Sequence, residues 1–222
     1  YSSGFSQWAI AIGSANNDYG FSIAVDAAGN TYITGTFSGT ADFDPGAGSA
    51  NLTPVGPGDI FFAKYNSSGV YQWANAMGGA NYDFGTSITV DAAGNTYITG
   101  YFSGTADFDP SAATVNLTAI GGDEIFFAKY NTNGNYIWAK SIGGGANDHG
   151  YGITKDASGN VLITGFFTGT VDFDPSAATA NVSTVGSSDV FFAKYDANGN
   201  YLWANSIGDT GSSVGYSIAT DN

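Results

Sequence analysis

The sequence predicts an all-β, β-propeller-like architecture built from tandem four-stranded antiparallel blades, and three observations carry this prediction. The chain repeats every 65 residues without insertion or deletion, short stretches of alternating polar and apolar residues recur in each period, and no stretch has a helical apolar stripe. Radially repeated four-stranded units are typical of a propeller, although the spacing also allows a stacked β-solenoid or a filament. The tryptophans that mark the period are Trp8, Trp73, Trp138 and Trp203.

The 222 residues read as one repeat array, 1–222, and not as separate domains. Residues 26–45 and 91–110 share 19 of 20 residues, so neighbouring repeats are nearly interchangeable. The expected repeats are about 1–65, 66–130 and 131–195, with a partial repeat at 196–222.

Each repeat opens with a β-hairpin. In the first copy, residues 22–25 alternate polar and apolar side chains, residues 26–30 read Asp-Ala-Ala-Gly-Asn, and residues 31–34 resume the alternation. Glycine permits the positive φ that such a turn requires. The aspartates that begin this turn are expected to cap it, and they stand at Asp26, Asp91, Asp156 and Asp221.

The second half of each repeat supplies two more strands. Residues 59–65 and 70–77 are β-forming runs joined by the turn 66–69, and the fourth strand contains the repeat tryptophan. The tryptophan row is expected to belong to the core or to the packing of the blades and not to form a sugar-stacking platform. An insert at 38–58 lengthens the repeat beyond the usual propeller blade of about 40–45 residues.

The motifs resemble a known family of bacterial repeats. The strings Phe-Phe-Ala-Lys-Tyr-(Asn/Asp)-x-x-Gly-x-Tyr-x-Trp-Ala and Asp-Ala-(Ala/Ser)-Gly-Asn are similar to the SBBP-type β-propeller repeat. The Gly-Thr-x-Asp-Phe-Asp-Pro variant resembles repeat arrays in cargo of the type IX secretion system. The resemblance implies a propeller-like fold and a secreted, extracellular cell-surface location, and it implies little about activity.

Composition excludes several classes of partner and chemistry. The chain has 18 Asp, one Glu, five Lys, no Arg and no Cys, and its formal net charge is −14. Nucleic acids and anionic membranes require cationic side chains, so neither is expected as a partner, and no apolar run is long enough for membrane insertion. The absence of cysteine excludes disulfides and thiol chemistry.

The insert carries the candidate metal site. Its Asp-Phe-Asp-Pro motif places two like charges on one side of an extended segment, where a hard cation could bridge them. Weak Ca²⁺ binding is therefore a possible cofactor interaction, and the competing interpretation is that each Asp forms a local turn with backbone amides. The residues are Asp42, Asp44, Asp107, Asp109, Asp172 and Asp174.

Other repeated polar residues are interpreted as structural. Lys64, Lys129 and Lys194 are expected to pair with a nearby carboxylate, with Asp59, Glu124 and Asp189 as candidates, or to protect a strand edge. Asp18, Asp83 and Asp148 are interpreted as turn formers between repeats, and the fourth copy has Ser213 instead. His149 replaces Tyr19 and Phe84 in register and is interpreted as a substituted aromatic residue.

These features favour a non-enzymatic structural or adhesive module, an adhesin-like part of a larger acidic array or filament. The alternative is a calcium-dependent propeller that binds a carbohydrate or protein ligand. A glycoside hydrolase is a remote alternative, since its two carboxylates need different environments and here the carboxylates are replicated symmetrically.

The pattern also predicts how the array is assembled. It implies 14 strands: four copies of the first and fourth strands, and three copies of the second and third. Three complete blades are too few to close a propeller, which generally has 4–8. Self-association or continuation in a longer repeat chain is therefore expected, because unpaired strand edges favour further pairing.

Overall fold

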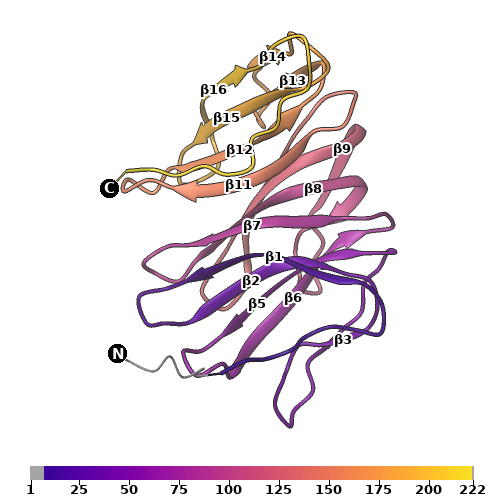
Figure 1. Cartoon of the computed structure of the whole chain (residues 1–222), viewed down its shortest axis with the longest axis vertical. Helices are drawn as coiled ribbons and strands as arrows, with labels where there is room; N and C mark the ends of the chain where they lie inside the picture. Colours follow the sequence, from indigo (N-terminus) through magenta and orange to yellow (C-terminus); the bar gives the residue numbers. More distant parts are fainter. Residues whose placement is uncertain (1–7, 222) are drawn as a thin grey trace.

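The chain folds into three four-stranded antiparallel blades that stack along the long axis of the molecule (Figure 1), and a short strand pairing joins the first two blades into one eight-stranded sheet. This computed structural model describes residues 8–221, which contain strands and turns but no helix, so the all-β prediction is confirmed. Among these residues there is accordingly no helix able to cross a lipid bilayer. The first blade contains β1 (Asp18–Val25), β2 (Thr31–Phe37), β5 (Asp59–Tyr65) and β6 (Tyr71–Gly79).

The second and third blades repeat this order. Their strands are β7 (Phe84–Val90), β8 (Thr96–Asp107), β9 (Asn116–Tyr130) and β10 (Tyr136–Ile142), then β11 (His149–Lys155), β12 (Val161–Phe167), β15 (Asp189–Tyr195) and β16 (Tyr201–Ile207). In each blade the strands pair in sequence order, and the pairing of Thr31 with Tyr65 recurs as Thr96 with Tyr130. The 65-residue register of the sequence is thus also a register of the backbone.

The insert forms a small hairpin that reaches the preceding repeat unit, a feature that sequence reasoning did not predict. In the first repeat this hairpin consists of β3 (Ala41–Asp42) and β4 (Asn51–Leu52). In the second repeat it is formed by the far ends of β8 and β9, and in the third by β13 (Thr170–Asp172) and β14 (Asn181–Ser183). The first Asp of each motif bridges the end of the preceding fourth strand, as in Gly78 with Asp107 and Gly143 with Asp172. The hairpin therefore fastens adjacent blades together.

The expected count of 14 strands is wrong: the described residues form 12 blade strands, and the insert adds the short strands β3, β4, β13 and β14. Residues 8–13 and 212–221 stand in register with a fourth and a first strand, but neither segment forms a β-ladder in the described chain. A ladder requires a neighbouring strand from the same blade, and neither segment has its own second and third strands. The expected beginning of the first segment, at residues 1–7, lies outside the described residues.

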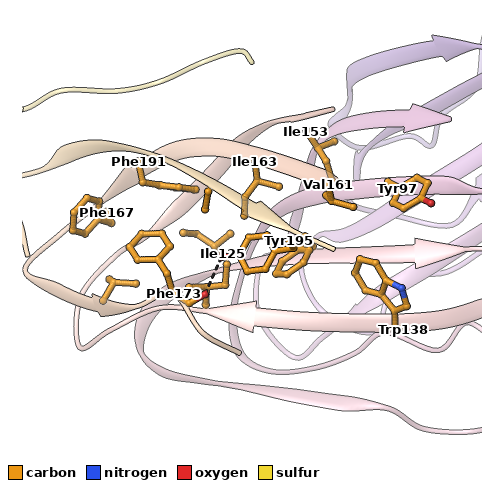
Figure 2. Close-up of a cluster of buried hydrophobic side chains, with 14 residues drawn as sticks. Tyr97, Ile125, Trp138, Ile153, Val161, Ile163, Phe167, Phe173, Phe191 and Tyr195 are labelled. Atoms are coloured by element: carbon orange, nitrogen blue, oxygen red, sulfur yellow. Dashed lines mark hydrogen bonds between the residues drawn. The ribbon is translucent and has the colours of Figure 1, made fainter. Parts of the chain in front are cut away.

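Of the three hydrophobic clusters in the described residues, two lie between blades, and the third lies within the first blade around Phe37, Phe43 and Tyr65. Phe62 of β5 packs against Tyr130 of β9 with ring centroids 4.4 Å apart, and Phe127 repeats the contact with Tyr195 at 4.4 Å. Figure 2 shows the cluster shared by the second and third blades, including the hydrogen bond of 2.9 Å from the Tyr195 hydroxyl to the backbone oxygen of Phe173. The first and second blades therefore complete their cores with side chains from the next blade.

The repeat tryptophans form a second contact between blades. The Trp73 indole nitrogen donates a hydrogen bond of 3.1 Å to the Thr132 backbone oxygen, in the β9–β10 turn of the next blade. Gly134 in that turn has a φ of 77°, and a Cβ there would come within 3.1 Å of the Trp73 ring. Glycine is thus required both for the turn conformation and for the close approach of the indole. Trp8 and Trp138 donate equivalent bonds to residues 59 positions later.

We predict that Trp138→Ala destabilises the chain far more than Trp203→Ala. Trp138 is 9% exposed between two blades, so its removal leaves a cavity and should lower the free energy of unfolding by about 3 kcal/mol. Trp203 occupies the same strand position, is 36% exposed and has no following turn in this chain, so its loss should cost less than about 1 kcal/mol. Urea unfolding followed by circular dichroism measures both values, and equal losses would contradict the inter-blade role of the indole.

Candidate functional site at the blade junctions

Two related pockets lie where adjacent blades meet on the insert side. We call them the inter-blade pockets; their volumes are about 180 and 230 Å³. Each residue that lines the first has its counterpart 65 positions later in the second. Main lining residues are Val55, Asp59, Gly78, Asp107 and Asp109 in the first pocket, and Ile120, Glu124, Gly143, Asp172 and Asp174 in the second.

A buried carboxylate forms the floor of each pocket. Asp59 is almost fully buried at the start of β5, and its Oδ2 accepts a hydrogen bond of 2.8 Å from the Val55 backbone nitrogen. In the second pocket Glu124 Oε2 accepts the equivalent bond from Ile120 at 2.7 Å. Burial raises the pKa of both carboxyl groups, and the bonds from the backbone oppose this shift.

The predicted pairing of the repeat lysines with these floor carboxylates is wrong. Asp59 and Lys64 stand at opposite ends of β5, and the floor carboxylates bond to the insert backbone instead. Lys194 pairs with the turn residue Asp156, with Nζ 2.8 Å from Oδ2. Lys64 and Lys129 lie over the rings of Tyr32 and Tyr97, 5.0 and 4.9 Å from the centroids. The side chains of these lysines thus lie on the side of the blade that carries the turns of the first hairpin.

The Asp-Phe-Asp-Pro motif is built around backbone hydrogen bonds. Asp42 Oδ1 accepts bonds of 3.0 Å from the Asp44 nitrogen and 2.8 Å from the Ala50 nitrogen, and Asp44 Oδ1 accepts one of 2.8 Å from Gly46. The bonds from Ala50 and Asp44 lower the pKa of Asp42. Phe43 between them is buried and packs on Phe61 at 5.1 Å.

The later copies of this motif repeat the same bonds. Asp107 and Asp172 each accept two backbone hydrogen bonds, and Asp109 and Asp174 each accept one. In the part of the chain that the structure describes, no three carboxylate or imidazole groups converge where one metal ion could sit. The geometry favours the turn-forming interpretation, and Ca²⁺ binding stays a prediction.

Buried aspartates hold the two connections between blades through hydrogen bonds to the backbone, a role that sequence reasoning underestimated. Asp83 is fully buried and accepts bonds of 2.7 Å from the Gly79 nitrogen and 3.2 Å from the Ser103 nitrogen. Asp148 repeats this at Gly144 and Thr168, both at 2.8 Å. The recurrence of Asp at an interval of 65 residues is the sequence signal for this role. The full burial of Asp83 and Asp148 depends on tertiary packing and does not follow from the sequence.

The turn aspartates bond within their own hairpins. Asp26 Oδ1 accepts bonds of 2.9 Å from the Ala28 and Asn30 backbone nitrogens, and Oδ2 accepts one of 3.0 Å from the Tyr32 hydroxyl. Asp91 and Asp156 make the same backbone bonds. Asp221 directly precedes the undescribed C-terminal residue, so its expected turn lies largely outside the described residues.

His149 occupies the aromatic position that its register predicts, and it also has polar partners that the sequence did not reveal. Its ring stacks on Tyr101 with centroids 3.7 Å apart, Nε2 lies 2.9 Å from Asp123 Oδ2, and Nδ1 lies 3.1 Å from the Tyr151 hydroxyl. Burial lowers the pKa of the imidazole, although Asp123 opposes this shift. Asp123 replaces Gly58 of the first repeat, so this pair belongs to one junction.

We predict that stability falls as the pH rises from about 4 to about 7. Burial raises the pKa of Asp83 to about 7 and that of Asp148 to about 6, above the unfolded value of 3.8. Such a group stabilises the fold while it is protonated, and its contribution is lost as the pH passes its folded pKa. One group contributes a slope of at most about 1.4 kcal/mol per pH unit.

Urea unfolding at several pH values measures this slope. Asp83→Asn cannot ionise but keeps an acceptor oxygen, so it should flatten the profile, whereas Asp209→Asn at an exposed carboxyl should not. A wild-type profile that rises over this range, or one that Asp83→Asn leaves unchanged, would contradict the assignment.

Comparisons with known proteins agree with this architecture. The SBBP β-propeller repeat model matches residues 7–42 and 72–108. An uncharacterised WD repeat-containing protein of Acanthamoeba polyphaga mimivirus is 30% identical over 197 residues, and the match covers 78% of this chain but 14% of that protein. A Bacteroides caccae protein of unknown function, known from a crystal structure, is 10% identical, with coverage of 86% and 83% and a TM-score of 0.27, which is too low to support an argument. The family match confirms the predicted resemblance: two segments of this chain, residues 7–42 and 72–108, are similar to the SBBP β-propeller repeat.

Proposed function

We propose that the chain is a non-enzymatic structural repeat module whose end blades stack on further blades of the same kind. The observation that carries this proposal concerns one isoleucine of the first strand. Ile23 on β1 is 64% exposed, whereas Ile88 and Ile153 at the same register are 4% and 5% exposed because a preceding blade covers them. The β1 side of the first blade thus presents one half of an interface that the chain forms twice internally.

The opposite end presents the other half. Trp203 is exposed, whereas Trp138 at the same position is covered by the next blade, and Tyr216 and Val214 are also exposed there. The counterparts of these end faces pack together at each internal junction. Trp8 already lies against Gly69 of the first blade, and residues 212–221 lie against β11 and β12, so a second copy would replace these two segments. Packing of Ile23 and Trp203 against a second copy would remove apolar surface from water.

The polar groups support a structural role over catalysis. The repeated aspartates described above accept hydrogen bonds from backbone nitrogens and so hold turns and junctions. The net charge of −14 favours solubility of an extended assembly. The SBBP resemblance supports placing this assembly in a secreted, cell-surface protein of a bacterium, where an adhesive role is the finer form of the proposal.

We predict that the isolated chain associates head to tail with increasing concentration. Ile23→Asp should block one end and Trp203→Asp the other, because each buries a charge in the contact. Each variant alone should then be monomeric, and an equimolar mixture should form a dimer, since one free end of each kind remains. Sedimentation velocity of the two variants and their mixture measures this.

Ile137→Asp serves as the control, since Ile137 is an exposed residue of β10 in the middle blade and lies on neither end face. It should leave the association of the chain unchanged. A wild-type chain that stays monomeric at high micromolar concentration, or a mixture that does not dimerise, would overturn the proposed stacking.

A further inference from the structure

A further pocket, which we call the connection pocket, lies between the connection that precedes β1 and the connection that joins the first two blades. Its volume is about 440 Å³, within the roughly 300–1,000 Å³ of ordinary small-molecule sites. No carboxylate and no lysine lines it, although the net charge of the chain is −14, so its lining suits an uncharged ligand. The lining residues are Ala15, Asn16, Asn17, Ser38, Pro57 and Tyr82.

A tyrosine ring in this pocket depends on a glycine beside it. Tyr82 is 54% exposed, whereas Gly58, which bridges to it, is buried. A Cβ at Gly58 would come within 2.8 Å of Cδ1 of the Tyr82 ring, so the ring can lie there only because residue 58 is glycine. Both positions differ in the other repeats, which have Asn17, Asn147 and Ser212 in place of the tyrosine, and Asp123 and Ser188 in place of the glycine. The ring and the glycine that admits it thus depart from the repeat together.

Tyr82 also stands at the end of a row of stacked rings. It stacks on Phe84 with ring centroids 6.1 Å apart and planes 22° apart, Phe84 stacks on Tyr101 at 4.8 Å, and Tyr101 stacks on His149 at 3.7 Å. The rings inside the row cover one another, whereas Tyr82 stays more than half exposed. The row therefore supports Tyr82 and leaves an aromatic surface for a ligand.

Amide and hydroxyl groups surround this ring. The Asn16 side-chain nitrogen donates a hydrogen bond of 2.7 Å to the Ser38 backbone oxygen, which leaves its Oδ1 as an acceptor toward the pocket. Asn17 is exposed and offers an amide, and Ser38 adds a hydroxyl. Such groups both donate and accept hydrogen bonds, so they match a ligand whose own groups do both.

The walls of the pocket are held in place by hydrogen bonds to two repeat aspartates. The Ser38 nitrogen donates a bond of 3.1 Å to Asp18 Oδ1, and the Asp83 nitrogen donates one of 2.9 Å to the Gly58 backbone oxygen. The Thr36 hydroxyl donates a further bond of 3.0 Å to the Asp83 backbone oxygen. The arrangement around Tyr82 is therefore formed before a ligand arrives, which lowers the entropic cost of binding.

This lining distinguishes among kinds of ligand. An anion would find no cationic partner there, and a hard cation would find no carboxylate. A purely apolar ligand would leave the amide and hydroxyl groups without hydrogen bonds. A pyranose ring has a face of C–H groups, which pack on an aromatic ring, and a rim of hydroxyl groups, which donate and accept hydrogen bonds.

We propose that the connection pocket binds one neutral pyranose unit of a glycan. The C–H face of the sugar lies on the Tyr82 ring, and its hydroxyl groups bond to Asn16, Asn17 and Ser38. This site goes beyond the stacking of blades and gives the chain a ligand of its own. It needs no calcium ion, because no carboxylate lines the pocket.

The test is a titration of the intact chain with three neutral sugars: methyl β-D-glucopyranoside, methyl β-D-galactopyranoside and methyl α-D-mannopyranoside. The amide NMR signals of Asn17, Ser38 and Tyr82 report on the pocket. We expect saturable shifts with at least one sugar, unchanged by EDTA. The open-chain alditol of the same sugar should bind at least about tenfold more weakly, because it has no rigid C–H face and must lose more conformational freedom.

Substitutions separate the aromatic contact from the polar contacts. Tyr82→Ala should weaken binding at least about tenfold without loss of the fold, since the ring is more than half exposed, and Tyr82→Phe should stay within about threefold of the wild type. Asn17→Ala should weaken binding about fivefold through the loss of hydrogen bonds. Tyr19→Ala is the matched control, because Tyr19 is 52% exposed but does not line this pocket, and it should leave binding unchanged.

Several results would overturn the proposal. These are the absence of a saturable response to all three sugars, equal binding of the alditol, a loss of binding with EDTA, and equal effects of Tyr82→Ala and Tyr19→Ala. Tighter binding of the neutral peptide Ac-Gly-Asn-Gly-NH₂ than of any sugar would assign the pocket to a polypeptide instead. No residue of the pocket belongs to the apolar contacts proposed for the end faces, so either proposal can fail without the other.

Discussion

The contact between one blade and the next determines how this chain is stabilised. Two of the three hydrophobic clusters in the described residues lie between blades, where Phe62 meets Tyr130 and Trp73 rests on the glycine turn at Gly134. A blade without a neighbour therefore leaves these apolar groups in water, as Ile23 does at one end of the array. Stability in such arrays is approximately a sum of blade terms and junction terms, so the number of junctions matters as much as the quality of each blade.

The acidic composition of the chain follows from the structural roles of its carboxylates. Backbone nitrogens at turns and connections need acceptors, and the repeat supplies aspartate at three such places, represented by Asp26, Asp42 and Asp83. Hydrogen bonds from the backbone favour the ionised form of Asp42, whereas burial favours the neutral form of Asp83. One residue type thus works in two electrostatic environments within a repeat, and a high negative charge follows from the architecture.

Much of this fold could be predicted because repeats convert one local pattern into several consistent observations. The hairpin that begins at Asp26 and the strand around Trp73 follow from alternation and turn chemistry. The insert hairpin did not, since β3 and β4 are two residues each and depend on contact with the preceding unit. The prediction that Asp59 pairs with Lys64 was wrong because the two residues lie at opposite ends of β5, and Asp59 bonds to the insert backbone there. The bond between Asp123 and His149 joins residues 26 positions apart and depends on tertiary packing.

The absence of insertions over the whole array follows from the same junctions. Every blade must fit a neighbour on each of its two sides, so a residue such as Tyr130 contacts its own blade and the preceding one. One extra residue in a strand would turn its buried side chains to the opposite face and would also move the tryptophan away from the next glycine turn. A change at one junction can be compensated only locally, as at His149 and Asp123, where both partners depart from the repeat together. At this junction the two substitutions complement each other, whereas a change in length would disrupt two junctions at once.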